Sequence, residues 1–254
     1  LHGIDAPMYY VALMTFILIF SSVTMVLAVD AGHHMKKNKV AFYMFLTIIG
    51  GAVFVGSQAW EWKNFIKGEY GALETKGGQI LQFVDGSSGK RVALSSFASN
   101  ISSERITQQK NTGIWFQNES SLPTFSLNEV KDGFLKKSNL LIRGEKINEA
   151  GEKIVLSREE SILKIRDAVN VVEGANLIHN EYGNRLFANF FFFITGFHGF
   201  HVFSGVVINI IIFFNVIIGT YEKRGHYEMV EKVGLYWHFV DLVWVFVFTF
   251  FYLV

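Results

Sequence analysis

The stretch Thr195–Phe214, TGFHGFHVFSGVVINIIIFF, decides how the chain is interpreted, because it places His198 and His201 in an otherwise uncharged apolar run. A helix of about 20 such residues is long enough to cross the hydrocarbon core of a bilayer. Comparable runs occur at three other places in the sequence. We therefore expect membrane helices over Met8–Val29, Val40–Trp60, Leu186–Ile218 and Val233–Val254.

The composition agrees with a membrane protein. Half of the 254 residues are hydrophobic, 26 residues are phenylalanine and only 2 are proline, which is more apolar material than one soluble core requires. The chain has no cysteine, which excludes disulfides, thiolate zinc sites and iron–sulfur ligation. The first span lacks the basic start and the cleavage site of a signal peptide, so we expect it to remain in the mature chain.

Basic residues gather in the two short loops that connect the spans. They are Lys36, Lys37 and Lys39 in the first loop, and Lys223, Arg224 and Lys232 in the last. Short loops rich in lysine and arginine stay on the cytoplasmic side of a membrane. We therefore expect both loops on the inner side and the C-terminus on the outer side; with the family resemblance given below, this implies the inner (plasma) membrane of a bacterium and a periplasmic C-terminus.

The sequence divides into three regions. Residues 1–62 hold the first two spans, residues 63–183 form a soluble insertion on the outer side, and residues 184–254 hold the last two spans. The first half of the insertion has short apolar runs between turn signals, which predicts strands and loops; it includes the stretch 100–113. The expected fold class is an all-α transmembrane bundle with a mixed α/β insertion.

One helix of the insertion is predicted from its start signal. Ser157 and Glu160 have the spacing of a capping box. Apolar residues then follow at helical spacing, so we expect a helix from about Arg158 to Val172. Its apolar face is expected to pack on the strands of the insertion, through Ile162, Ile165, Val169 and Val172.

Few polar side chains lie inside the spans, and these are the candidate functional residues. They are Gln58, Glu61, His198, His201, His238 and Asp241. An ionised side chain at the bilayer centre costs roughly 2.5 to 3.5 kcal/mol on insertion scales, so such residues face protein or water.

The residues alone leave three interpretations open, since a carboxylate di-metal centre can be set aside. His198 and His201 are three positions apart on one helix, so a haem would need a cross-helix pair of axial ligands such as His201 with His238. A carboxylate di-metal centre needs Glu-x-x-His motifs from two helices, whereas this chain has one His-x-x-Asp motif. Proton or ion transport and plain hydrogen bonding between helices remain the other two.

Two motifs carry a resemblance to a known family. TGFHGFHVFSG at 195–205, followed by YWHFVDLVWVFVFTFFYL at 236–253, resembles the last two helices of subunit III of the haem-copper oxidases. LMTFILIFSSVTMVLAVDAGHH at 13–34 and FLTIIGGAVFVGSQAWEW at 45–62 resemble the two preceding helices. The resemblance implies the last four helices of a larger bundle and does not cover the insertion.

The resemblance also implies what the polar residues do. The chain would carry no catalytic residue, haem or metal, since haem and copper belong to partner subunits. The residues expected to hold the bundle together are His198, His201, His238, Asp241 and Trp244, with Gln58 and Glu61 in a polar cluster toward the outer side.

The partners follow from the resemblance as well. They are subunits I and II and bound phospholipid, with support for proton uptake at the inner face during oxygen reduction; nucleic acid is not expected. The electron donor is cytochrome c or a quinol. Lys223, Arg224 and Asn215 are candidates for lipid headgroups, although ordinary positive-inside signalling accounts equally for the two basic residues.

Two further expectations concern the insertion and the function class. The insertion is expected to dock subunit II or another respiratory complex, because long loops of this kind are usually functional or disordered. The alternatives from other classes are a stand-alone bis-histidine b-type cytochrome and a membrane transporter.

Overall fold

The computed structural model describes residues 7–98, 125–147 and 153–252. The chain divides into two compact units, one of residues 1–62 with 191–254 and the other of residues 63–190. The stretch 100–113, for which the sequence predicts strands and loops, lies outside the described residues.

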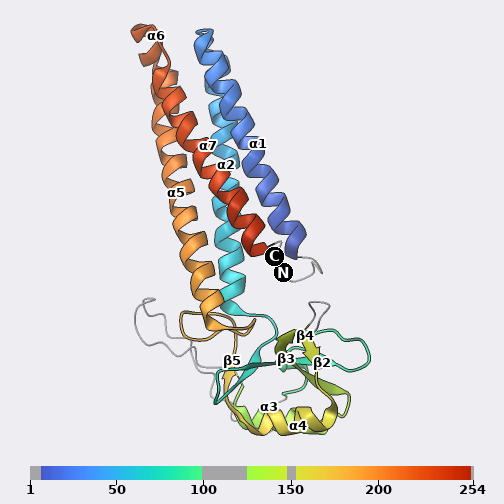
Figure 1. Cartoon of the computed structure of the whole chain (residues 1–254). Helices are drawn as coiled ribbons and strands as arrows, with labels where there is room; N and C mark the ends of the chain where they lie inside the picture. The colour runs from blue at the N-terminus through green and yellow to red at the C-terminus, as the bar shows by residue number, and fades with distance from the viewer. Residues whose placement is uncertain (1–6, 99–124, 148–152, 253–254) are drawn as a thin grey trace. The chain divides into compact units, whose positions relative to one another are not determined.

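The first unit is a bundle of four long helices (Figure 1). Each is long and apolar enough to cross a membrane, so the chain is a multi-pass membrane protein and the predicted fold class is confirmed. A short helix connects the last two long ones. The helices are α1 (Pro7–His33), α2 (Lys37–Lys67), α5 (Arg185–Ile218), α6 (Thr220–Arg224) and α7 (Glu228–Tyr252).

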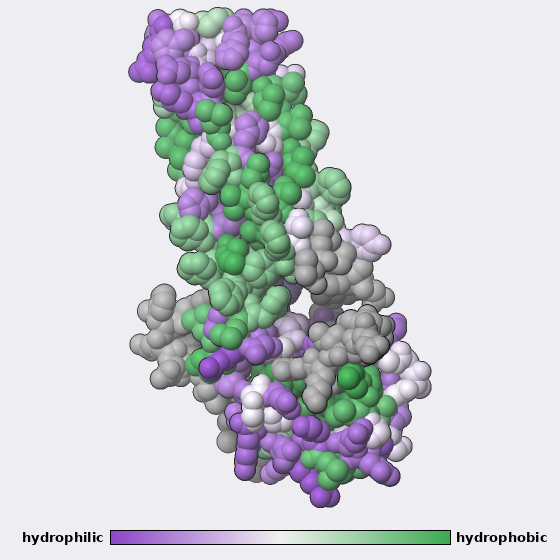
Figure 2. Space-filling view, viewed as in Figure 1, coloured by the Kyte–Doolittle hydropathy of each residue, from purple (hydrophilic) through white to green (hydrophobic). Residues whose placement is uncertain are grey.

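The outer surface of the bundle is apolar. Figure 2 shows hydrophobic residues over the middle of the bundle and hydrophilic residues at the end that carries α6. Large side chains such as Phe16, Phe193 and Phe250 are more than 60% exposed. Such a surface suits acyl chains or other membrane helices, because a lipid environment offers no partner for exposed polar groups.

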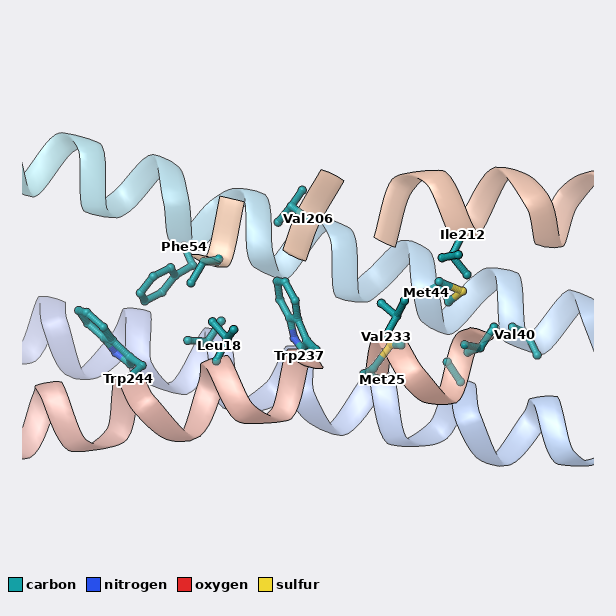
Figure 3. Packing of buried hydrophobic residues seen from close by; sticks show 14 of the residues in the cluster. Leu18, Met25, Val40, Met44, Phe54, Val206, Ile212, Val233, Trp237 and Trp244 are labelled. Atoms are coloured by element: carbon teal, nitrogen blue, oxygen red, sulfur yellow. The ribbon is translucent and has the colours of Figure 1, made fainter. Parts of the chain in front are cut away.

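The bundle core is built around two tryptophans of α7. Trp237 and Trp244 are seven positions apart, so they lie on one face of the helix, and both are almost fully buried (Figure 3). Phe54 of α2 packs edge-on against Trp244, with ring centroids 4.8 Å apart. Glycines make room for Trp237: a methyl group added at Gly51 would overlap its indole and would lie 2.7 Å from Val206 Cγ2.

The second unit contains a five-stranded antiparallel sheet with strand order β4-β3-β2-β1-β5. Its core includes Phe83 of β2, whose ring contacts Phe97 and Phe134 at centroid distances of 4.8 and 5.7 Å. The elements are β1 (Ala72–Thr75), β2 (Ile80–Asp85), the 3₁₀ turn η1 (Leu94–Ser96), α3 (Leu127–Lys136), β3 (Leu140–Ile147), β4 (Lys153–Val155), α4 (Arg158–Arg166) and β5 (Ala168–Val172).

The predicted helix of the insertion starts correctly but is too long. Ser157 and Glu160 form the capping box, so the start signal is confirmed. The helix ends at Arg166, and the following residues, Ala168–Val172, form β5, which pairs with β1. The sequence AVNVV explains the error, because its apolar residues also fit a half-buried strand and valine favours strands.

A buried carboxylate closes the base of the insertion. Glu181 is fully buried and accepts hydrogen bonds from the backbone amides of Gly71 at 3.1 Å and Gly174 at 2.6 Å. Arg91 lies 3.9 Å from the same carboxylate and stacks over the Tyr70 ring at 4.5 Å. Burial lowers the pKa of Arg91, and the charge of Glu181 counteracts this shift. Glu181 therefore joins the segment that enters the insertion to the segment that leaves it.

The close approach at Gly51 gives a prediction about bundle stability. Gly51→Ala should destabilise the full chain by about 1 to 3 kcal/mol, because Trp237 must shift to accept the methyl group. Gly56→Ala is the matched control on the same helix, since a methyl group there meets no atom within 4 Å. Thermal unfolding of both variants in detergent measures the effect; equal melting temperatures would contradict it.

Candidate functional site

The sequence-predicted residues lie in separate groups along the bundle. Gln58, Glu61 and His198 lie toward the end where α2 leads into the insertion, which we name the insertion-side end. His238 and Asp241 lie on α7 against α1, nearer the end that carries α6. The structure thus brings the polar residues together in small sets rather than in one centre.

Glu61 connects α2 to the last turn of α7. Tyr252 donates a hydrogen bond from its hydroxyl to Glu61 Oε1 at 2.9 Å, and Gln58 Nε2 donates to Glu61 Oε2 at 3.0 Å. The Gln58 side chain is buried, and its Oε1 atom has no hydrogen-bond partner among the described residues. The glutamate is therefore held by donors from two helices.

His198 is packed between aromatic rings. Its imidazole stacks on Trp244 with centroids 5.0 Å apart and meets the Phe54 ring edge-on at 5.7 Å. The residue is only 4% exposed. Trp244 in turn donates from Nε1 to Thr15 Oγ1 at 2.9 Å, which connects this aromatic cluster to α1.

His238 and Asp241 face α1. The Oγ atom of Ser22 lies 2.5 Å from His238 Nδ1, within hydrogen-bond distance. Asp241 lies beside both Ser22 and His238, and its buried Oδ1 atom has no hydrogen-bond partner within the described part of the chain.

His201 stands apart from the other histidines. Its Nδ1 atom lies 2.8 Å from the backbone carbonyl of Phe197, one turn earlier on α5. Its ring contacts Phe197 and Phe200 at centroid distances of 4.7 and 5.9 Å. His238 thus bonds α1, whereas His201 bonds its own helix.

Metal ligation has no geometric support in the described chain. Within residues 7–98, 125–147 and 153–252, no three histidine, aspartate or glutamate side chains converge on a point where they could hold a metal ion.

The candidate lipid contacts lie at the α6 end. Lys223 and Arg224 are exposed. Asn215 donates from Nδ2 to the Ile211 carbonyl of its own helix at 2.9 Å. Lys37 Nζ lies 3.5 Å from Glu222 Oε2, so the two short loops contact each other.

Sequence reasoning missed the hydroxyl groups of α1. Ser21 accepts a hydrogen bond from Trp237 Nε1 at 3.1 Å, and Thr24 bonds the hydroxyl of Thr47 on α2 at 2.8 Å. A further missed contact joins α2 to α5, where Trp62 Nε1 donates to Thr195 Oγ1 at 3.0 Å. The available signal was the cluster of serine and threonine in an otherwise apolar span, since such residues commonly bond across membrane helices.

A groove between α1 and α7 was also missed. Its cavity has a volume of about 380 Å³, and its polar lining is Asp30, His33, Glu231 and His238. His33 Nε2 lies 3.7 Å from Glu231 Oε2 at the exposed mouth. On α7 the polar positions are seven apart, which places Glu231 and His238 on one helix face. The groove therefore leads from exposed carboxylates to the partly buried His238.

Comparison with known proteins extends over the last third of the chain. The family model for cytochrome c oxidase subunit III matches residues 167–254. The match begins at Asp167, so it includes the end of the insertion, which the resemblance in the sequence did not cover. The resemblance of α1 and α2 to this family stays a prediction.

Curated relatives carry the same name. The chain is 39% identical over 79 residues to cytochrome c oxidase subunit 3 of Thermostichus vulcanus, covering 28% of this chain and 37% of that protein. It is 43% identical over 75 residues to the probable cytochrome c oxidase subunit 3 of Rickettsia conorii, covering 29% of this chain and 26% of the relative. A Synechocystis relative is 41% identical over 78 residues, covering 30% and 33% of the two chains.

The chain spans between about a quarter and just over a third of the length of these relatives. The predicted resemblance to subunit III of the haem-copper oxidases is confirmed. Over residues 167–254, which include its last two membrane helices, the chain is similar to cytochrome c oxidase subunit III.

Proposed function

We propose that this chain is a non-catalytic subunit of a bacterial haem-copper oxidase that stabilises the oxygen-reducing subunit I. The supporting observation is that polar groups in the spans bond other helices of the same chain, as Ser21 does with Trp237 and Glu61 with Tyr252. Haem and copper would belong to partner subunits. Cytochrome c is the proposed electron donor, because the relatives are named cytochrome c oxidase subunits.

The loop charges support an orientation. Lys36, Lys37 and Lys39 lie between α1 and α2, and Lys223 and Arg224 lie in α6. We place this end on the cytoplasmic side and the insertion on the periplasmic side. Exposed Lys223 and Arg224 would meet anionic phospholipid headgroups there, each contact contributing about 1 kcal/mol. Asn215 bonds its own helix and is a weaker candidate.

Purification of the full complex tests the stabilising role. A tag on this chain should retain the haem-containing subunits. His238→Leu should weaken that retention, because it leaves Ser22 without its partner, at a cost of about 1 to 3 kcal/mol. Haem per retained complex, measured by absorption, should not change.

His226→Leu is the control for this prediction, since His226 is exposed and lies in the turn between α6 and α7. Loss of the haem signal in proportion to this chain would instead favour the bis-histidine cytochrome. A wild-type chain that retains no oxidase subunit would contradict the proposed function itself.

We further propose that the groove between α1 and α7 collects protons for the oxidase. Its mouth presents Asp30, His33 and Glu231, with His34 beside Asp30 at 3.7 Å. His238 also lines the groove and is only partly exposed. Imidazole is the side chain suited to proton exchange near neutral pH, and clustered carboxylates raise the local concentration of a cation.

The proton proposal predicts a pH-dependent defect. The double variant Asp30→Asn, Glu231→Gln should slow steady-state turnover roughly twofold or more at alkaline pH, where protons are scarce and their collection limits the rate. At acidic pH the rate should approach that of the wild type. Glu228→Gln is the control, because Glu228 bonds Lys232 at 2.6 Å and does not line the groove. An equal defect at every pH would contradict proton collection.

We also propose that the insertion docks a partner subunit or another respiratory complex. It is a folded unit with its own aromatic core, and Leu135 on α3 and Leu163 on α4 are 52% and 60% exposed. Exposed apolar side chains on a rigid helical layer suit a protein contact.

A deletion designed on the sheet tests this docking. Ala72 and Val172 are paired neighbours in β1 and β5, so a two-glycine linker can replace residues 73–171. The deletion keeps Glu181 with its amide donors at Gly71 and Gly174. The shortened chain should retain subunit I and lose subunit II or the second complex. Retention of every partner would count against the proposal.

A further inference from the structure

His201 is held rigidly on the outward face of α5. Its Nδ1 atom bonds the Phe197 carbonyl at 2.8 Å. Its own carbonyl accepts a hydrogen bond from the Tyr236 hydroxyl of α7 at 3.1 Å. Both the ring and the backbone of this residue are therefore fixed before any partner arrives.

The hydrogen bond to Phe197 determines what the other ring nitrogen offers. A carbonyl oxygen only accepts, so Nδ1 must carry the proton of the bond. An uncharged imidazole has one donor and one acceptor, which leaves Nε2 of His201 as an acceptor. Among the described residues, no hydrogen bond to this Nε2 atom is formed.

The surroundings of His201 are apolar. Phe193, Phe197 and Phe200 are 70%, 62% and 64% exposed on the same side of α5. Together with His201 they form what we name the His201 face. His201 is near the midpoint of α5 (Arg185–Ile218), so in a membrane-spanning helix we place it within the hydrocarbon core rather than among the headgroups.

An acceptor at this depth needs a donor that lipid does not supply. Acyl chains have no donor, and water is scarce in the hydrocarbon core. Polar groups of membrane helices are therefore usually satisfied by a neighbouring helix.

We infer that the His201 face is a docking surface for a transmembrane helix of a partner subunit. That helix presents a hydrogen-bond donor, such as a serine, threonine or tryptophan side chain, to His201 Nε2, and its apolar side chains pack between the phenylalanine rings. The inference rests on the proposed function, because it assigns the contact by which this chain holds its oxidase partner.

The decisive variant is His201→Phe in the tagged complex. Phenylalanine keeps a planar ring on the face and removes the acceptor. Retention of the haem-containing subunits at increasing detergent should fall roughly threefold, the loss expected for one interhelical hydrogen bond. Thermal unfolding of the isolated chain should not change, because no other described helix bonds the imidazole ring.

Phe203→Leu is the matched control: Phe203 is 54% exposed on α5 but lies two positions after His201, on another face of the helix, so this variant should retain the partner as the wild type does. Full retention in His201→Phe would overturn the inference, as would a matching loss of stability in the isolated chain. Failure of the wild-type chain to retain any oxidase subunit would instead overturn the proposed function.

A photoreactive benzoylphenylalanine at Phe200 gives an independent measurement. A cross-link to a membrane helix of another subunit supports the docking surface. Cross-links to phospholipid alone would show that the face is open to acyl chains, and would overturn it.

Discussion

The bundle depends on hydrogen bonds between hydroxyl groups of α1 and nitrogen atoms of α7. Thr15 bonds Trp244, Ser21 bonds Trp237 and Ser22 bonds His238. Thr15 lies one to two turns before Ser21 and Ser22 on α1, whereas its partner Trp244 lies one to two turns after Trp237 and His238 on α7, as antiparallel helices require. Apolar packing alone gives a weak register in lipid, because acyl chains are as apolar as leucine. These directional bonds fix how α1 and α7 are aligned. They thereby also fix the position of Trp237, which lies in the space that Gly51 leaves open.

A comparable constraint operates at the base of the insertion. Glu181 binds the amides of Gly71 and Gly174, and β1 lies beside β5, so the insertion leaves and returns at one place. The entropic cost of a longer loop grows slowly with its length once its ends are held together. A large insertion between α2 and α5 therefore leaves these two helices free to contact each other, as Trp62 and Thr195 do.

The sequence predicted the elements better than their contacts. Hydropathy found all four membrane helices, because a lipid-spanning run is a long and simple signal. The strand β5 was mistaken for helix, since AVNVV carries both periodicities over so short a length. The roles of Ser21 and Thr15 were not predictable from the run alone. A hydroxyl in an apolar helix commonly bonds its own backbone, as both of these do, and the sequence does not show which tryptophan of another helix also donates to it.

The two proposed roles of the α1–α7 contact are physically separable. His238 belongs to both, because it bonds Ser22 and also lines the groove, so its replacement disturbs packing and proton transfer together. Asp30 and Glu231 lie at the exposed mouth, where side chains contribute little to stability. A change at the mouth that alters turnover without altering assembly therefore reports on proton transfer alone. Exposure along the groove thus separates His238, which also stabilises the helix contact, from Asp30 and Glu231, which exchange protons with water.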